Sequence, residues 1–123
     1  MILYKITYMK ILIVEDEALI STTLSFFLKK ENIDVCGVTP SSVEAIKLAK
    51  ENNPDVIIMD TTLEDGDGIT TTKKIKEFLD TRFIFCTGAD KQLLDEISKL
   101  NPLMIMKKPF SIDRLIKIIK DII

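Results

Sequence analysis

The chain has 123 residues, of which 46% are hydrophobic and 29% are charged, and its net charge is −2. These values predict one globular domain with a real hydrophobic core, and they argue against an intrinsically disordered chain. The pI of about 5.2 gives no global attraction to nucleic acid or to an anionic membrane. No apolar run reaches the ~20 residues that a membrane span needs.

The sequence contains no histidine, which excludes histidine-based catalysis and the commonest protein metal ligand. Cys36 and Cys86 lie in apolar, strand-like runs without a CxxC spacing, so we interpret them as reduced core residues of a cytoplasmic protein. Residues 1–9 lack the features of a signal peptide. We treat them as an N-terminal extension of unknown structure, ahead of a single domain at residues 10–123.

Five short apolar runs have the length and composition of buried strands, and an amphipathic helical pattern follows each of them. The runs occupy residues 10–14, 33–38, 56–59, 82–86 and 103–106. The expected inward helix positions include Leu19, Ile20, Thr23, Leu24, Phe27 and Leu28, then Val43, Ile46 and Ala49, and later Leu93, Leu94, Ile97 and Leu100.

Local signals mark the helix ends. Ser41 and Glu44 have the spacing of a capping box, and Asp90 and Ser111 are the expected N-caps of the fourth and last helices. The third helix is expected at residues 69–79, where three threonines lower the helix propensity.

The last helix is unusually apolar. Its apolar residues fill an arc of about 160°, wider than a plain core stripe. They are Ile112, Leu115, Ile116, Ile118, Ile119, Ile122 and Ile123. We interpret this pattern as a thoroughly buried helix. The alternative assigns its margin, near Ile118 and Ile122, to a partner or to a second copy of the chain.

Strands that alternate with helices predict an α/β fold, a doubly wound five-stranded parallel sheet with helices on both faces in a three-layer αβα arrangement. In such sheets, ligands bind outside the carboxyl ends of the strands, where the strand order reverses. Polar side chains follow four of the five strands. They are Glu15 and Asp16 after the first, Asp60 after the third, Thr87 after the fourth and Lys108 after the fifth.

These side chains fit phosphoryl chemistry. Glu15, Asp16 and Asp60 at one sheet edge would repel one another unless protons or a cation neutralised them. A donor set made only of oxygen suits a hard cation such as Mg²⁺. Lys108 and the Thr87 hydroxyl could contact phosphoryl oxygens, and a carboxylate such as Asp60 can attack phosphorus to form an aspartyl phosphate.

Four motifs then carry a family resemblance: ILIVEDE, VIIMD…L…GDG, FCTGA and KKPF, in this order. The sequence resembles the receiver domain of two-component response regulators over residues 10–123. The resemblance implies a flavodoxin-like fold with strand order 2-1-3-4-5. It also implies that Asp60 accepts a phosphoryl group from a sensor histidine kinase or a phosphotransfer protein.

The resemblance also assigns roles to the other site residues. It implies that Asp16 and Asp60 bind Mg²⁺ directly, that Glu15 assists through water and that Thr62 contributes its backbone carbonyl. It further implies that Thr87 and Lys108 contact the phosphoryl group. The Lys108–Pro109 peptide bond is expected to be cis.

Two departures from the family pattern stand out. Receivers often carry Tyr or Phe three residues before the motif lysine, where this chain has Ile105. Receivers that hydrolyse their phosphoryl group quickly often have an amide or carboxylate two positions after the acceptor and two after the threonine. Here Thr62 and Ala89 stand there, so we predict a slowly hydrolysing phosphoryl-aspartate.

We therefore predict a stand-alone receiver in the cytoplasm that is not an enzyme beyond its own phosphoryl transfer and slow dephosphorylation. It would pass its signal by protein–protein contact through the face of the fourth helix, fifth strand and fifth helix. We expect no direct nucleic-acid partner and no membrane partner, and the prediction leaves a homodimer open.

The residues taken alone leave other interpretations of the site and of the function open. The run Glu15-Asp16-Glu17 is also what the acidic first turn of a helix looks like, and Asp60 could simply start a turn. A flavin or nucleotide carrier would need a Ser/Thr/Gly-rich loop in place of that acidic run. A haloacid-dehalogenase-like phosphatase would place its aspartate after the first strand. A pseudo-receiver, which binds partners without phosphorylation, would be expected to lack the acid pair, Asp60 or Lys108.

Overall fold

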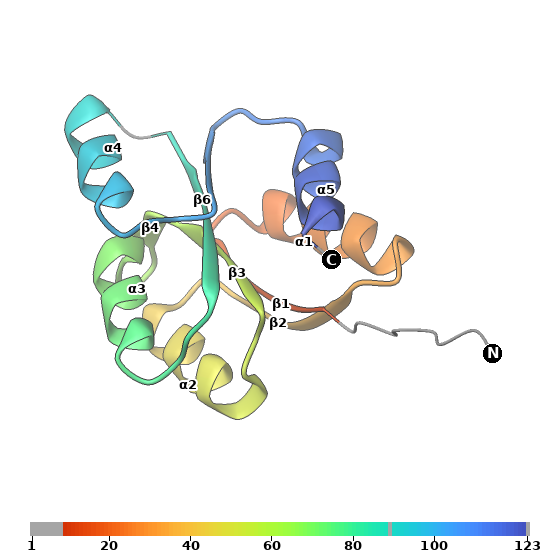
Figure 1. Cartoon of the computed structure of the whole chain (residues 1–123), viewed down its shortest axis with the longest axis horizontal. Helices are drawn as coiled ribbons and strands as arrows, with labels where there is room; N and C mark the ends of the chain where they lie inside the picture. Colours follow the sequence, from red (N-terminus) through yellow and green to blue (C-terminus); the bar gives the residue numbers. More distant parts are fainter. Residues whose placement is uncertain (1–8, 89, 123) are drawn as a thin grey trace.

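The computed structural model describes residues 9–88 and 90–122, and it shows a parallel sheet between two layers of helices (Figure 1). The elements are β1 Lys10–Val14, α1 Ala18–Lys30, β2 Asp34–Thr39, α2 Ser42–Asn52, β3 Val56–Asp60, β4 Thr62–Leu63, β5 Gly66–Asp67, α3 Gly68–Lys76, β6 Arg82–Thr87, α4 Lys91–Ser98, β7 Met104–Lys107 and α5 Ile112–Asp121. The α/β fold class and the five main strands are confirmed.

The main sheet has the strand order β2-β1-β3-β6-β7, and all of its neighbouring strands are parallel. Counting these five strands along the chain gives 2-1-3-4-5, the order that the resemblance implies. The chain leaves β1 toward one edge of the sheet and returns on its other side at β3, so the strand order reverses between these two strands. The crevice outside the carboxyl ends of β1 and β3 is where such a sheet places its ligands.

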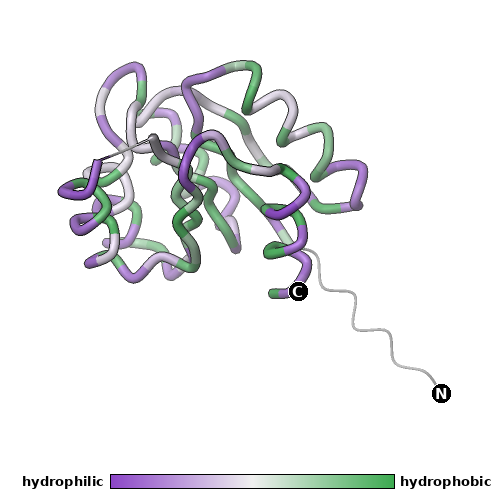
Figure 2. Tube along the Cα trace, turned by 90° about the horizontal axis from the view of Figure 1, so that it is seen from above, coloured by the Kyte–Doolittle hydropathy of each residue, from purple (hydrophilic) through white to green (hydrophobic). Residues whose placement is uncertain are grey.

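Alternation along the central strands builds two apolar layers, because successive strand residues point to opposite faces. On one face, Ile11, Ile13 and Ile58 pack with buried residues of α1 and α5. On the other face, Leu12 and Met59 lie in a layer with residues of α2, α3 and α4. Figure 2 shows hydrophobic stretches of the chain gathered in the central part of the molecule.

Two inward positions were predicted wrongly. Leu19 is 81% exposed and Val43 is 72% exposed, although both were expected to face the core. Ser21 and Ala45 are buried instead, since small side chains allow α1 and α2 to approach the sheet closely. Hydrophobicity alone favours the larger residues, although the remaining positions expected to face inward on α1 and α2 are buried or partly buried.

The N-caps follow the sequence signals. The side chains of Ser41, Asp90 and Ser111 accept hydrogen bonds from the backbone N–H groups of Glu44, Leu93 and Arg114, respectively. The third helix is shorter than expected, because α3 ends at Lys76 and residues 77–78 form a turn.

The segment between β3 and α3 contains a short antiparallel hairpin, β4–β5, that was not predicted. Gly68 follows it and begins α3. A Cβ atom at this position would collide with the backbone carbonyl oxygen of Asp60, so only glycine lets the helix start this close to the end of β3.

In α5, Leu115, Ile116 and Ile119 are buried, while Ile118 and Ile122 are partly buried against the same layer. Ile123 lies outside the described residues. Both cysteines are free thiols; Cys86 is buried as expected, and Cys36 is only partly so. Among the described residues, no helix combines the length and the apolar content needed to cross a bilayer.

Candidate functional site

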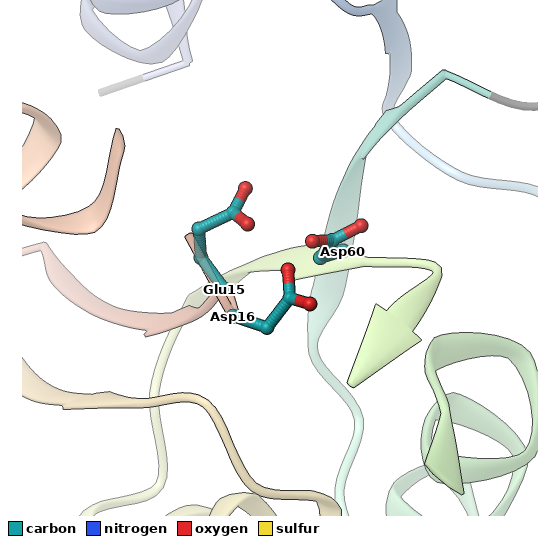
Figure 3. Close-up of side chains that lie close together, drawn as sticks. All are labelled: Glu15, Asp16 and Asp60. Carbon is teal, nitrogen blue, oxygen red and sulfur yellow. The ribbon is translucent and has the colours of Figure 1, made fainter. Parts of the chain in front are cut away.

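Three carboxylates meet at the carboxyl ends of β1 and β3. Glu15 and Asp16 follow β1, and Asp60 is the last residue of β3. Their carboxylate oxygens lie within 4.8 Å of one another, and Figure 3 shows the three groups converging on a shared space. Glu15 and Asp60 are 2% and 4% exposed, whereas Asp16 is exposed. The predicted acidic cluster therefore exists, and two of its three members are buried.

Lys108 reaches the same space from the end of β7. Its Nζ lies 3.0 Å from Oε1 of Glu15 and 3.1 Å from Oδ2 of Asp60. A third carboxylate oxygen, Oε1 of Glu17, lies 3.4 Å from the same ammonium at the exposed rim. The Lys108 N–H also donates to the carbonyl oxygen of Thr87 at 2.8 Å, which fixes the lysine backbone beside β6. The Lys108–Pro109 peptide bond is cis, as the resemblance implies.

Burial and mutual contacts shift the pKa values of all three carboxyl groups. Burial raises the pKa of Glu15 to about 8, and a hydrogen bond with Asp60 acts in the same direction. The hydrogen bond between Asp16 and Asp60, assisted by burial, raises the pKa of Asp16. Burial opposes ionisation of Asp60, but hydrogen bonds with Glu15, with Asp16 and with the Thr62 N–H outweigh it and lower the pKa of Asp60. Asp60 is thus the carboxylate that holds its negative charge most firmly.

The ammonium of Lys108 is held as a cation in the same cluster. Burial acts against the charge, but hydrogen bonds with Glu15 and Asp60 outweigh it and raise the pKa of Lys108. A single ammonium neutralises only part of the charge of three neighbouring carboxylates. The raised pKa values of Glu15 and Asp16 show that the cluster favours a proton or a further cation.

The oxygen donors fit a hard divalent cation. Glu15, Asp16 and Asp60 can each offer one oxygen within the same small space, and neither sulfur nor nitrogen belongs to the set. Such a donor set suits Mg²⁺, which keeps several waters and needs few protein ligands. Thr62 follows closely, and its backbone N–H donates to Oδ1 of Asp60 at 3.2 Å. The proposed ligand role of the Thr62 carbonyl stays a prediction.

Two threonine hydroxyls adjoin the carboxylates. Thr87, the last residue of β6, is fully buried, and its Oγ1 lies 2.7 Å from Oγ1 of Thr61. The sequence interpretation included Thr87 but missed Thr61. The available signal was its position directly after Asp60, since Asp60 of β3 pairs with Cys86 of β6 and the next residues along these two segments are Thr61 and Thr87.

A surface pocket of about 520 Å³ opens over these groups. It is lined by Asp16, Glu17, Asp60, Thr61, Thr62, Thr87, Gly88, Leu93 and Lys108. The lining joins a buried carboxylate, an ammonium and hydroxyl groups. This arrangement can receive a dianionic group at Asp60, with positive charge and hydrogen-bond donors beside it.

The chain matches a family model and is similar to a chemotaxis protein over most of its length. Residues 11–120 match the family model described as the response regulator receiver domain. The chain is similar to the chemotaxis protein CheY of Bacillus subtilis, with 33% identity over 113 residues that cover 89% of this chain and 93% of CheY.

Similarity also extends to parts of longer proteins. The transcriptional regulatory protein PdtaR of Mycobacterium tuberculosis is 31% identical over 112 residues, which cover 90% of this chain but 55% of PdtaR. Among solved structures, the signal receiver domain of a modulated diguanylate cyclase from Desulfovibrio desulfuricans G20 superposes with a TM-score of 0.84. That alignment has 29% identity and covers 94% of this chain and 93% of the other.

Proposed function

Because the chain belongs to the response regulator receiver domain family, we propose that it is a phosphorylation-switched signalling module whose acceptor is Asp60. One observation carries the proposal. The Asp60 carboxylate is buried, has a lowered pKa and lies 3.1 Å from the Lys108 ammonium beside two further acids. An ionised carboxylate in such a place is a competent nucleophile.

In the proposed reaction, a carboxylate oxygen of Asp60 attacks the phosphorus of a phosphohistidine on a sensor kinase or phosphotransfer protein. The new O–P bond forms as the P–N bond breaks, and the imidazole departs with the electron pair. Residues 1–123 contain no histidine, so none of them is this donor, and a small phosphodonor such as acetyl phosphate is the alternative source.

Each neighbouring side chain has a part in this step. The Lys108 ammonium, already within 3.1 Å of Asp60, would pair with a phosphoryl oxygen. The Thr87 hydroxyl would donate to a second oxygen. Glu15, Asp16, Asp60 and the Thr62 carbonyl would hold Mg²⁺, which when bound supplies positive charge that offsets the carboxylates and the phosphoryl oxygens.

We propose that the phosphoryl group leaves slowly. Fast release needs a side chain that orients a water molecule beside the acyl phosphate. Thr62 carries neither an amide nor a carboxylate. Ala89, the second position considered from the sequence, lies outside the described residues, and alanine offers no such group either.

We further propose that the output is a protein–protein contact through α4, β7 and α5, in the cytoplasm. Several apolar side chains of these elements are only partly buried. They are Leu93, Leu94, Met104, Ile105, Ile118 and Ile122. Ile105 takes the place of the family aromatic and packs at the margin of the α2–α4 layer.

The test is the intact mass of the protein after incubation with acetyl phosphate and Mg²⁺. We expect one added phosphoryl group in the parent and none in Asp60→Ala. Glu64→Gln, which changes an exposed acid in the neighbouring hairpin, should behave like the parent. If the parent gained no mass while Mg²⁺ binding was confirmed, the protein would instead be a pseudo-receiver or would require its own kinase.

A further inference from the structure

The hydrogen bond between Thr61 and Thr87 joins the acceptor strand to the threonine that the reaction needs. The two hydroxyl oxygens are 2.7 Å apart in a buried position. Both backbones are anchored: the Thr61 carbonyl accepts from the Gly68 N–H at 2.9 Å, and the Thr87 carbonyl accepts from the Lys108 N–H at 2.8 Å. The hydroxyls therefore meet across the ends of β3 and β6, where each backbone is held by a further hydrogen bond.

Strand alternation places this contact on one side of the sheet. Thr87 continues the series of Phe83 and Phe85, which belong to the layer beneath α2, α3 and α4. Asp60 continues the series of Val56 and Ile58, which belong to the opposite layer. The contact with Thr61 thus holds the Thr87 hydroxyl on the side opposite to the series that ends in Asp60.

We propose that Thr61 is a positioning residue that opposes the phosphorylated state by competing for the Thr87 hydroxyl. The inference rests on the proposed function, since it requires a phosphoryl group on Asp60. To reach that group, the Thr87 side chain must turn from the face of the sheet that carries Thr61 toward the series that ends in Asp60, and this turn breaks the contact with Thr61 whichever hydroxyl donates in it. The bond therefore stabilises the unphosphorylated arrangement and has no counterpart in the phosphorylated one.

The size of the effect follows from one neutral hydrogen bond. Its net contribution corresponds to about a five-fold change in an equilibrium constant. Thr61→Val keeps the shape of the side chain and removes the hydroxyl, so this variant should favour the phosphorylated arrangement by about that factor. Thr61→Ser retains the hydroxyl and should restore the behaviour of the parent.

The experiment uses the full chain with Mg²⁺ and beryllofluoride, a phosphoryl analogue that is followed by its own ¹⁹F NMR signal. We expect Thr61→Val to bind beryllofluoride about five-fold more tightly than the parent, and Thr61→Ser to match the parent. Asp60→Ala should show no saturable signal.

A second readout needs no ligand on the variant. We expect the methyl resonance of Thr87 in unliganded Thr61→Val to move toward its position in the beryllofluoride-bound parent, because the population shifts in that direction. A loss of packing alone would not move this resonance toward its position in the beryllofluoride-bound parent. Equal thermal unfolding midpoints of the parent and the variants would show that valine is accommodated at position 61 without loss of stability.

The outcomes separate the two proposals. Parent binding that depends on Asp60, together with an unchanged or weaker affinity of Thr61→Val, would overturn the role of Thr61 alone. An affinity of Thr61→Ser equal to that of Thr61→Val would also overturn it, since the hydroxyl would then not matter. Absence of any saturable signal in the parent would overturn the proposed function and this inference with it.

Discussion

The carboxylate of Asp65, at the turn of the β4–β5 hairpin, accepts a hydrogen bond of 2.6 Å from the backbone N–H of Ser42, the first residue of α2. The same carboxylate accepts from the Val43 N–H at 3.2 Å and from the Ser41 hydroxyl at 2.9 Å. An acid from the loop after Asp60 thus caps a helix that begins more than twenty residues earlier, and it lies where the helix dipole favours negative charge.

The Asp65 cap predicts a pH-dependent contribution to stability. Hydrogen bonds from the Ser42 and Val43 N–H groups lower the pKa of Asp65. The stabilisation is therefore present above the ordinary aspartate pKa and is lost as the pH falls through the lowered folded value. Asp65→Asn should unfold at lower urea concentration than the parent at neutral pH, and the difference should shrink in acid. Glu64→Gln is the matched control, and an equal loss in this control would contradict the prediction.

A buried hydroxyl in α3 offers a stabilising substitution. Oγ1 of Thr72 is buried and has no hydrogen-bond partner among the residues that the structure describes. Thr72→Val should raise the free energy of unfolding by about 1 kcal/mol, because an unpaired polar group costs desolvation and the two residues have similar helix propensity. Urea unfolding measures this change.

The adjacent threonine is the matched control for that substitution. The Thr71 hydroxyl is paired, since it donates to the carbonyl oxygen of Asp67 at 2.7 Å and contacts the hydroxyl of Ser42. Thr71→Val should therefore lower the free energy of unfolding by about 1 kcal/mol. Changes of the same sign in both variants would show that the two hydroxyls are not distinguished by their pairing.

Cation binding should release protons near neutral pH. Burial and the hydrogen bond with Asp60 raise the pKa of Glu15 to about 8, so the metal-free cluster retains a proton at pH 7. A divalent cation needs the ionised carboxylate, so its affinity should rise as the pH increases toward 8. Calorimetric titration with Mg²⁺ in buffers of different ionisation enthalpy counts the protons released. Glu15→Gln should release fewer, and a parent that released none would show that the cluster is already fully ionised.

The lifetime of the phosphoryl group tests the role of the position after Thr61. We expect the phosphorylated parent to persist for longer than seconds in Mg²⁺, because Thr62 cannot orient an attacking water. Thr62→Asn introduces an amide at this position and should shorten the lifetime severalfold. Decay of the phosphorylated intact mass gives the rate, and Glu64→Gln should leave it unchanged. Decay of the parent within seconds would refute the argument.

Sequence reasoning could place Asp60 and Lys108 together because polar residues that follow apolar strand-like runs are easily recognised in a sequence. Asp60 stands directly after one apolar run and Lys108 stands two residues after another, and a parallel sheet brings the ends of such runs to one edge. The same logic could not find the Asp65 cap, because it depends on how the β4–β5 hairpin meets the start of α2, which neither strand period nor local capping patterns encode. The Thr61–Thr87 pair was missed for another reason: it follows from the pairing register of β3 and β6, which the sequence interpretation did not use.

The misplaced helix faces have a different cause. Leu19 and Val43 are more hydrophobic than Ser21 and Ala45, but the buried positions are set by how closely a helix approaches the sheet. Close approach selects small side chains, and a hydrophobic pattern gives these little weight. Glu17 was given no role at the site and entered only the alternative interpretation of an acidic first turn, and only the three-dimensional arrangement brings it to Lys108.

Gly68 joins the start of α3 to the end of β3, the strand that carries the proposed acceptor Asp60. Its backbone abuts the carbonyl oxygen of Asp60, and its N–H donates to the carbonyl oxygen of Thr61. The side chain of Met59 lies against the same point, so the end of β3 and the first turn of α3 meet without a gap. We therefore expect a rearrangement at Asp60 to be passed directly to the start of α3, with main-chain contact as part of the path.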